Sequence, residues 1–283
     1  MEEQTKKKSS PMKKIDVHAH TTNRVVKGVV PQSADVEALK REMEKHNIEK
    51  TVLLATYFPH KSSGVSNFRL YNWIRDRPEF LLFGSLDFEN YLFQGINELK
   101  ELDDMGVLKG VKVYTSYQEI DLHSDRFADV VSVARRNFLP MMFHCGQSYS
   151  TKKKFGRSSV ANMVKASDLE FLAEDNPEMN FLASHMSKPF FEDLVKTVKR
   201  NPNIYTDVSG LVSSKYDQGQ VPAMVEEVKR FLGECGPKRL MFGTDFPVQT
   251  HEDSVYFVEE AMKDFSDKDK QDVYYNNARR FLK

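Results

Sequence analysis

Two histidines near the start of the chain, His18 and His20, have the residue type and the spacing to bind one metal ion. They lie in residues 14–20, KIDVHAH, whose apolar start predicts a short β-strand. Because side chains alternate faces along a strand, both imidazoles should point the same way, about 6–7 Å apart. Imidazole nitrogen is a good ligand for Zn²⁺. Two unrelated surface histidines are the alternative, and the rest of the chain must decide between them.

Three further residues that could bind a metal or move a proton stand near the ends of later predicted strands: His144, His185 and Asp245. With the first pair, four of the eight histidines fall at strand ends, and the others lie in predicted helices and loops. We interpret the five residues as one site. The alternatives are a hydrogen-bonded core histidine for any single imidazole, and a helix N-cap for Asp245.

Histidines combined with one aspartate suit a borderline divalent ion such as Zn²⁺. Three or four protein ligands with one open position are typical of a catalytic rather than a structural site. The metal would lower the pKa of a bound water toward ~7 and could polarise a substrate carbonyl. A carboxylate could then move a proton from the nucleophile to the leaving group. A further imidazole could stabilise the oxygen that becomes negative.

Eight strand-like runs, each followed by a helical run, account for the chain after its first 13 residues. The strands are predicted at residues 14–20, 50–57, 80–87, 110–115, 140–146, 179–186, 204–210 and 239–247. Continuous apolar strands indicate burial on both faces, as in a parallel sheet covered by helices. Eight βα units in about 250 residues predict a single-domain α/β fold, a (β/α)8 TIM-like barrel over residues 14–283. An open doubly wound sheet is the alternative, but the first strand lacks the glycine-rich phosphate loop that would favour it.

A barrel of this kind brings the carboxyl ends of all its strands to one mouth, where active sites lie. The histidines and the aspartate that end four of the predicted strands should therefore face each other across that mouth. The sequence thus predicts one catalytic site built from residues far apart in the chain.

Composition excludes several classes of partner. Lys+Arg and Asp+Glu both number 41 in 283 residues, so the net charge of zero argues against nucleic acid or an anionic membrane. The sequence contains no run of ~18 apolar residues, so no membrane span is predicted. Two cysteines, Cys145 and Cys235, form no disulfide framework, so we expect a cytoplasmic location. Residues 1–13 are polar and lysine-rich and predict a disordered tail rather than a signal peptide.

The chain resembles the amidohydrolase superfamily, in its amidohydrolase-related metal-dependent hydrolase branch. The motifs that carry the resemblance are residues 15–20 (IDVHAH), 110–113 (GVKV), 140–146 (PMMFHCG), the strand of His185, 239–247 (RLMFGTDFP) and 276–281 (NNARRF). They follow one another in order over nearly the whole chain after the tail. The pairing of H-x-H with the G-T-D-F-P turn is the most specific part of the match.

The resemblance implies a distorted (β/α)8 barrel with one divalent ion, for which we expect Zn²⁺. It implies that His18, His20, His144 and Asp245 lie close to the ion, with His185 near the substrate carbonyl. The branch contains lactonases and other hydrolases, and also decarboxylases of unsaturated or aromatic acids, so the fold alone does not settle the reaction.

We expect a hydrolase of a small polar molecule with a lactone, ester or amide carbonyl, in which Asp245 and His185 are catalytic. The reason is that both histidines of H-x-H are present and no decarboxylase signature is visible. A metal-dependent decarboxylase is the enzymatic alternative, and a barrel that only binds a ligand is the non-enzymatic one. The sequence leaves the oligomeric state open, and either a monomer or a homo-oligomer fits it.

Three residues are candidates for binding the substrate: Lys112, Tyr114 and Arg157. Lys112 and Tyr114 share one face of the fourth predicted strand. In some superfamily members a carboxylated lysine on this strand bridges two metals, but a clamp on a substrate carboxylate or a structural ion pair suits a one-metal branch better. Arg157, in the loop after the fifth strand, could bind an anion with its forked guanidinium, or could be a solvated side chain. Asp16 could orient a histidine from beneath.

Overall fold

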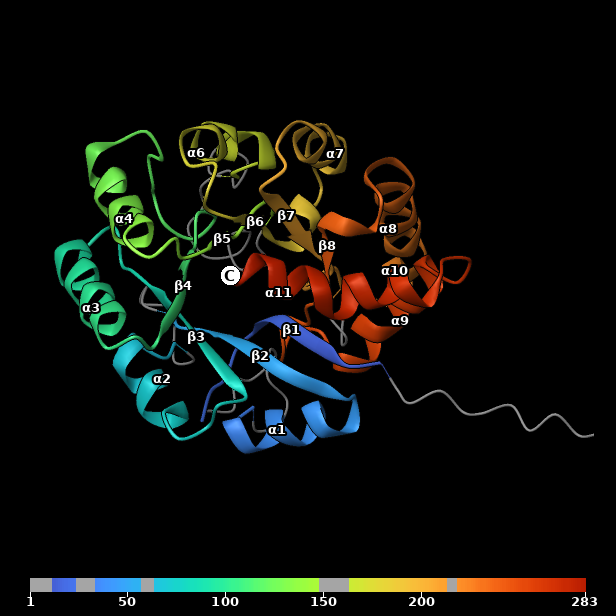
Figure 1. The fold of residues 1–283 in the computed structure, drawn as a ribbon, viewed down its shortest axis with the longest axis horizontal. Helices are drawn as coiled ribbons and strands as arrows, with labels where there is room; N and C mark the ends of the chain where they lie inside the picture. The colour runs from blue at the N-terminus through green and yellow to red at the C-terminus, as the bar shows by residue number, and fades with distance from the viewer. Residues whose placement is uncertain (1–11, 24–33, 57–63, 148–162, 213–217) are drawn as a thin grey trace, which may run out of the picture.

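The structure is a computed structural model that describes residues 12–23, 34–56, 64–147, 163–212 and 218–283. Its eight strands form one parallel sheet in the order β1 to β8, surrounded by helices (Figure 1). The sheet curls until its edges meet, where Ala19 forms a parallel bridge with Phe246 and Val17 N–H donates to Phe242 O. The predicted single-domain (β/α)8 barrel is therefore confirmed.

The strands are β1 Lys14–Ala19, β2 Ile48–Leu54, β3 Phe80–Ser85, β4 Leu108–Val113, β5 Met141–Phe143, β6 Phe181–Ala183, β7 Ile204–Asp207 and β8 Leu240–Met241. Several are shorter than the apolar runs suggested. After β6, residues His185, Met186 and Ser187 adopt positive φ angles of 59°, 48° and 54°. Side chains disfavour this left-handed region, so three such residues in succession turn the chain sharply away from the sheet.

The helices around the sheet are α1 Val36–Lys45, α2 Asn67–Ile74, α3 Leu92–Asp104, α4 Asp125–Arg135, α6 Glu170–Asp175, α7 Phe191–Arg200, α8 Val221–Cys235, α9 His251–Ala261, α10 Asp267–Gln271 and α11 Asn277–Phe281. Several of these helices begin after a residue whose side chain caps the first turn. In α1, for example, the side chain of Asp35 accepts a hydrogen bond from Ala38 N–H. The helical segment that runs from α10 to α11 is interrupted by a π-helical turn at Asp272–Asn276. That interruption lets α11 change direction and cross the end of the barrel (Figure 1).

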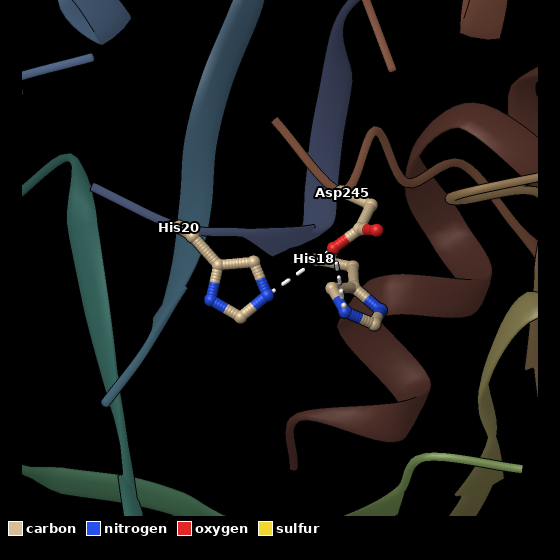
Figure 2. Close-up of side chains that lie close together, drawn as sticks. All are labelled: His18, His20 and Asp245. Carbon is tan, nitrogen blue, oxygen red and sulfur yellow. Dashed lines mark ion pairs between the residues drawn. The ribbon is translucent and has the colours of Figure 1, made fainter. Parts of the chain in front are cut away.

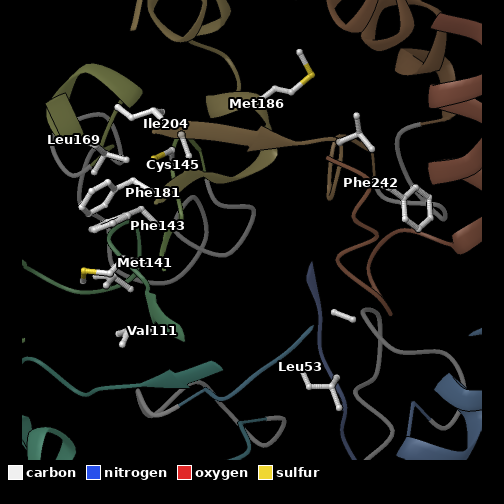
Figure 3. Close-up of a cluster of buried hydrophobic side chains, with 14 of the residues drawn as sticks. Leu53, Val111, Met141, Phe143, Cys145, Leu169, Phe181, Met186, Ile204 and Phe242 are labelled. Atoms are coloured by element: carbon white, nitrogen blue, oxygen red, sulfur yellow. The ribbon is translucent and has the colours of Figure 1, made fainter. Parts of the chain in front are cut away.

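Two apolar layers hold the barrel together. One lies between the sheet and the helices and includes Val111, Phe143 and Phe181 (Figure 3). The other fills the barrel around Val17, Phe83, Met142, Leu182 and Phe281, all fully buried. Phe281, on α11, packs against Phe83 with a ring-centroid distance of 6.3 Å. The last helix therefore closes the amino end of the barrel and leaves the opposite end for the site.

The predicted tail lies outside the described residues except for Met12 and Lys13. Met12 packs against the core, and its carbonyl accepts a hydrogen bond from Asn47 Nδ2 at 2.9 Å. Lys13 Nζ lies 2.7 Å from Glu49 Oε2. In the parts of the chain that the structure describes, no helix is both long enough and apolar enough to cross a membrane.

Candidate active site

His18, His20 and Asp245 meet at the carboxyl end of the barrel (Figure 2). Asp245 Oδ1 lies 3.2 Å from His20 Nε2 and 3.5 Å from His18 Nε2. The three donor atoms are all within 4.8 Å of one another. The side chain of His18 is 1% exposed, whereas His20 and Asp245 are 24% and 15% exposed. The cluster is therefore reachable from solvent on the side of His20 and Asp245.

Backbone geometry positions Asp245. Its φ of 55° is left-handed, a conformation that Asp tolerates better than most residues, and its N–H donates to His18 O at 2.7 Å. Gly210, with φ of 60°, lies directly beside it. A Cβ at Gly210 would be 2.8 Å from both Asp245 Oδ2 and His185 Nδ1. Only glycine fits there, because both functional groups occupy the space that a side chain would take.

His144 and His185 form a second pair of buried imidazoles beside this cluster. His185 Nε2 lies 3.1 Å from His144 Nδ1, and the His185 ring is 4.7 Å from that of His18. His144 belongs to neither of the two groups of mutually close donor atoms among the described residues. Its Nε2 is buried without a hydrogen-bond partner. The structure thus brings all five predicted residues together, with His144 held by His185 rather than by Asp245.

The protonation of these groups follows from their burial. Burial lowers the pKa of His18 and of His144 well below 6.5, and the nearby Lys112 and other histidines lower it further. Both rings are therefore neutral at pH 7, the state in which imidazole binds metals. Burial raises the pKa of Asp245, but the hydrogen bond from His20 and the other imidazoles outweigh it and bring the value to about 2.

Lys112, in β4, and Tyr114, directly after this strand, flank the same cluster. Lys112 Nζ lies 3.5 Å from His18 Nε2 and 3.1 Å from Ser184 Oγ, and the residue is completely buried. Burial lowers the pKa of Lys112 to about 8, although Asp207 and Asp245 act in the opposite direction. The Tyr114 ring is 6.4 Å from that of His20, and its hydroxyl donates to Ala55 O. Arg157 lies outside the described residues.

Asp207 and Ser209, at the end of β7, were missing from the predicted site. Asp207 Oδ2 lies 2.9 Å from His18 Nδ1, and Asp207 Oδ1 accepts the backbone N–H of His185 at 2.8 Å. Both residues are fully buried. The predicted strand at residues 204–210, IYTDVSG, ends in them, so the strand-end rule that selected the histidines could also have selected these two.

The donor atoms present fit a divalent cation. Two imidazole nitrogens and one carboxylate oxygen converge at His18, His20 and Asp245, as a Zn²⁺ ion requires. The unpartnered Nε2 of His144 is a further buried lone pair, which costs free energy unless a donor or cation meets it. Asp207 bonded to the far nitrogen of His18 is the arrangement that commonly orients a metal-binding histidine.

Comparison with known families gives one match. The sequence model of the amidohydrolase family matches residues 94–283, which include β4 to β8 and the site residues Lys112, Tyr114, His144, His185, Asp207, Ser209, Gly210 and Asp245. No curated protein sequence matches the chain.

Solved structures with the same barrel include enzymes of two kinds. An amidohydrolase from Burkholderia multivorans with bound Zn aligns with a TM-score of 0.69 at 16% identity, over 95% of this chain and 99% of that one. A protein assigned as a 2-pyrone-4,6-dicarboxylic acid hydrolase from Pseudomonas putida has a TM-score of 0.66 at 16% identity, over 96% and 97%. The 5-carboxyvanillate decarboxylase from Sphingomonas paucimobilis has a TM-score of 0.67 at 13% identity, over 96% and 99%. At such identities the likeness shows the fold alone.

Proposed function

Because this chain belongs to the amidohydrolase family, we propose that it is a metal-dependent hydrolase of a small polar substrate with a lactone, ester or amide carbonyl. The observation that carries the proposal is the convergence of His18, His20 and Asp245 within 4.8 Å at the open end of the barrel. In this cluster the His18 ring is buried and neutral, beside it the buried His144 Nε2 has no hydrogen-bond partner, and perturbed groups of this kind gather at functional sites.

His18, His20 and Asp245 would hold one divalent ion, with Zn²⁺ the expected one, and His144 Nε2 would be a further ligand. Such an ion, when bound, lowers the pKa of water and polarises a carbonyl oxygen. The fit rests on the neutral rings of His18 and His144 and on the buried Nε2 of His144, which has no hydrogen-bond partner.

Asp245 is the group proposed to move the proton. Its Oδ1 faces His18 and His20, so Oδ2 is left to contact the attacking water. A pKa of about 2 keeps the carboxylate ionised at neutral pH, so it can accept a proton and deliver it to the leaving group. Its position in a rigid left-handed turn would hold it in line for both transfers.

His185 is proposed to support the negative oxygen of the substrate. Its Nδ1 lies 2.9 Å from Ser209 O, which can only accept, so this nitrogen carries the proton of the neutral ring. Its Nε2 atom faces His144 Nδ1 at 3.1 Å, so in this arrangement neither nitrogen of His185 is free to donate to an oxyanion. The proposed role requires the bond to His144 to open and Nε2 to take up a proton from solvent. Lys112 and Tyr114 would bind polar groups of the substrate, and Arg157 remains a candidate for an anionic group.

The second candidate is a metal-dependent decarboxylase of an unsaturated or aromatic acid. Two observations favour it: the likeness to 5-carboxyvanillate decarboxylase, and Lys112, a buried cation beside His18 that could hold a carboxylate. The same metal ligands would serve, with Asp245 or His185 handling a proton at carbon. Hydrolysis and decarboxylation differ in their products, so an experiment separates them directly.

The experiment begins with protein stripped by a chelator and reloaded with Zn²⁺, whose stoichiometry is measured by elemental analysis. Lactones, esters, amides and unsaturated acids are then screened. Acid formation without CO₂ supports hydrolysis, and CO₂ release supports the alternative. Asp245→Asn should keep the fold and most of the metal but lose turnover, whereas Asp264→Asn, at an exposed site, should keep it. Unchanged turnover in Asp245→Asn would remove that residue from the mechanism, and failure to bind any divalent ion would remove the function.

A further inference from the structure

The hydroxyl of Ser209 is a hydrogen-bonding hub between three buried groups. Ser209 Oγ lies 2.8 Å from Asp207 Oδ1, 3.0 Å from His18 Nδ1 and 3.1 Å from His185 Nδ1. All four side chains are at most 7% exposed, so water does not compete for these bonds. The hub therefore joins two imidazoles that come from β1 and from the turn after β6.

The number of hydrogens available determines which atom donates and which accepts in each of these hydrogen bonds. A hydroxyl has one hydrogen and two lone pairs, and a carboxylate only accepts, so Ser209 donates its hydrogen to Asp207 Oδ1. Ser209 Oγ can then only accept from His18 and His185. A second acceptor faces each ring nitrogen, Asp207 Oδ2 for His18 and Ser209 O for His185, both at 2.9 Å. Both rings must therefore carry their proton on Nδ1.

The same reasoning extends to a third ring. If His185 carries its proton on Nδ1, its Nε2 accepts, and the facing His144 Nδ1 at 3.1 Å must donate. The unprotonated atom of His144 is then Nε2, the buried nitrogen that has no hydrogen-bond partner. Three histidines, at or after the ends of three different strands, thus present an Nε2 lone pair because of the acceptors at the end of β7. Lys112 Nζ, 3.5 Å from His18 Nε2, favours the same tautomer of that ring.

We propose that Asp207 and Ser209 are a positioning pair that holds His18, His185 and, through His185, His144 in the Nδ1-protonated tautomer. The tautomers are a property of the metal-free protein, and only their use in binding an ion rests on the proposed function. The bond made by one nitrogen of an imidazole sets the state of the other. The pair therefore leaves His18 Nε2 and His144 Nε2 ready for a cation.

The first test is the tautomeric state of histidine in metal-free protein, labelled with ¹⁵N at histidine and read from long-range ¹H–¹⁵N correlations. Wild-type protein should show His18, His144 and His185 protonated on Nδ1. In Asp207→Asn the amide oxygen can keep the bonds from Ser209 and from His185 N–H, so its NH₂ faces His18 Nδ1 and donates. His18 should then switch to the Nε2-protonated form, which cannot bind an ion through that nitrogen.

Ser209→Ala removes the hydroxyl with little change in size but leaves an acceptor at each ring, Asp207 Oδ2 for His18 and the backbone oxygen of residue 209 for His185. Both rings should therefore stay protonated on Nδ1, while each loses one of the two contacts that fix its orientation. Thr206→Val is the matched control, because it removes another buried hydroxyl from β7 that bonds only Ala183 O. Zn²⁺ affinity should fall about 10- to 100-fold in the first two variants and stay unchanged in the control. Circular dichroism of each variant reports whether it has folded.

Wild-type protein with His18 protonated on Nε2 would overturn the proposal, even if a variant failed to fold. Wild-type tautomers in folded Asp207→Asn would also overturn it, and unchanged Zn²⁺ affinity in folded Ser209→Ala would remove the Ser209 hydroxyl from the pair. If the tautomers follow the expectation but no divalent ion binds, the proposed function fails and this inference stands. If the ion binds tightly and neither variant changes tautomers or affinity, the inference alone fails.

Discussion

Asp16 and Thr244, which are 228 positions apart, are joined by two hydrogen bonds that fasten β1 to the turn carrying Asp245. Thr244 donates its N–H to Asp16 Oδ1 at 3.1 Å and its hydroxyl to Asp16 Oδ2 at 2.7 Å. The N–H of His18 also donates to Asp16 Oδ1, at 3.0 Å. One buried carboxylate thus sets the positions of His18 and Asp245 relative to each other.

Thr244→Val should lower the free energy of unfolding by about 1–3 kcal/mol, because the buried Asp16 carboxylate loses a donor. Urea denaturation measures this loss, and weaker Zn²⁺ binding should accompany it. Thr51→Val is the control: Thr51 Oγ1 is also buried but has no hydrogen-bond partner, so its removal should cost nothing. Equal losses in the two variants would show that the Thr244 hydroxyl has no special importance.

Gly210→Ala should both destabilise the protein and abolish tight Zn²⁺ binding. The positive φ costs an L-residue about 1–2 kcal/mol, and the new Cβ would collide with Asp245 and His185. Gly106→Ala separates the two effects, since Gly106 has a φ of 71° and nothing within 4 Å of its Cβ position. Only the backbone cost should appear there, with Zn²⁺ titration unchanged. Retention of full affinity in Gly210→Ala would show that the site tolerates the displacement.

Phe281→Ala should lower the free energy of unfolding by about 3–5 kcal/mol, although the residue lies in the last turn of the chain. Its ring is fully buried at the amino end of the barrel, 6.3 Å from the ring of Phe83 and 5.6 Å from that of Tyr205. Phe138→Ala, at a side chain that is 53% exposed, should cost far less in the same urea titration. A small loss for Phe281→Ala would mean that α11 is not needed to close the barrel.

Stability should fall as the pH drops below 6.5, in part because of His251. Burial lowers the pKa of His251 to about 3, with His46 and Lys45 acting in the same direction. The unfolded chain therefore binds the proton near pH 6.5 and the folded chain only near pH 3, so acid favours unfolding between these values.

His251→Gln should remove this contribution. The difference in free energy of unfolding between wild type and variant should then change by up to about 1.4 kcal/mol per pH unit from pH 6.5 down to about pH 4. Urea titrations across this range measure it. His123→Gln, at an exposed site, should follow the wild-type curve. A constant difference between wild type and His251→Gln would show that the folded protein accommodates the charged imidazole.

Much of the architecture follows from local pattern. Apolar runs and helical spacing predicted eight βα units, and the barrel rule then placed His18, His20 and Asp245 at one end, where the structure has them within 4.8 Å. The local pattern did not predict the residues at which the strands end. The left-handed turn at His185, for example, arises where β6 meets residues from other strands.

The alternation of strands and helices, and the position of reactive side chains at strand ends, could be read from the residues alone because hydrophobic periodicity is a local property. Which side chains hydrogen-bond each other, His144 to His185 and Asp207 to His18, became known only from the folded chain. These bonds depend on strand register and on a few left-handed residues, so they form between segments whose distance in the chain carries no information about their contact.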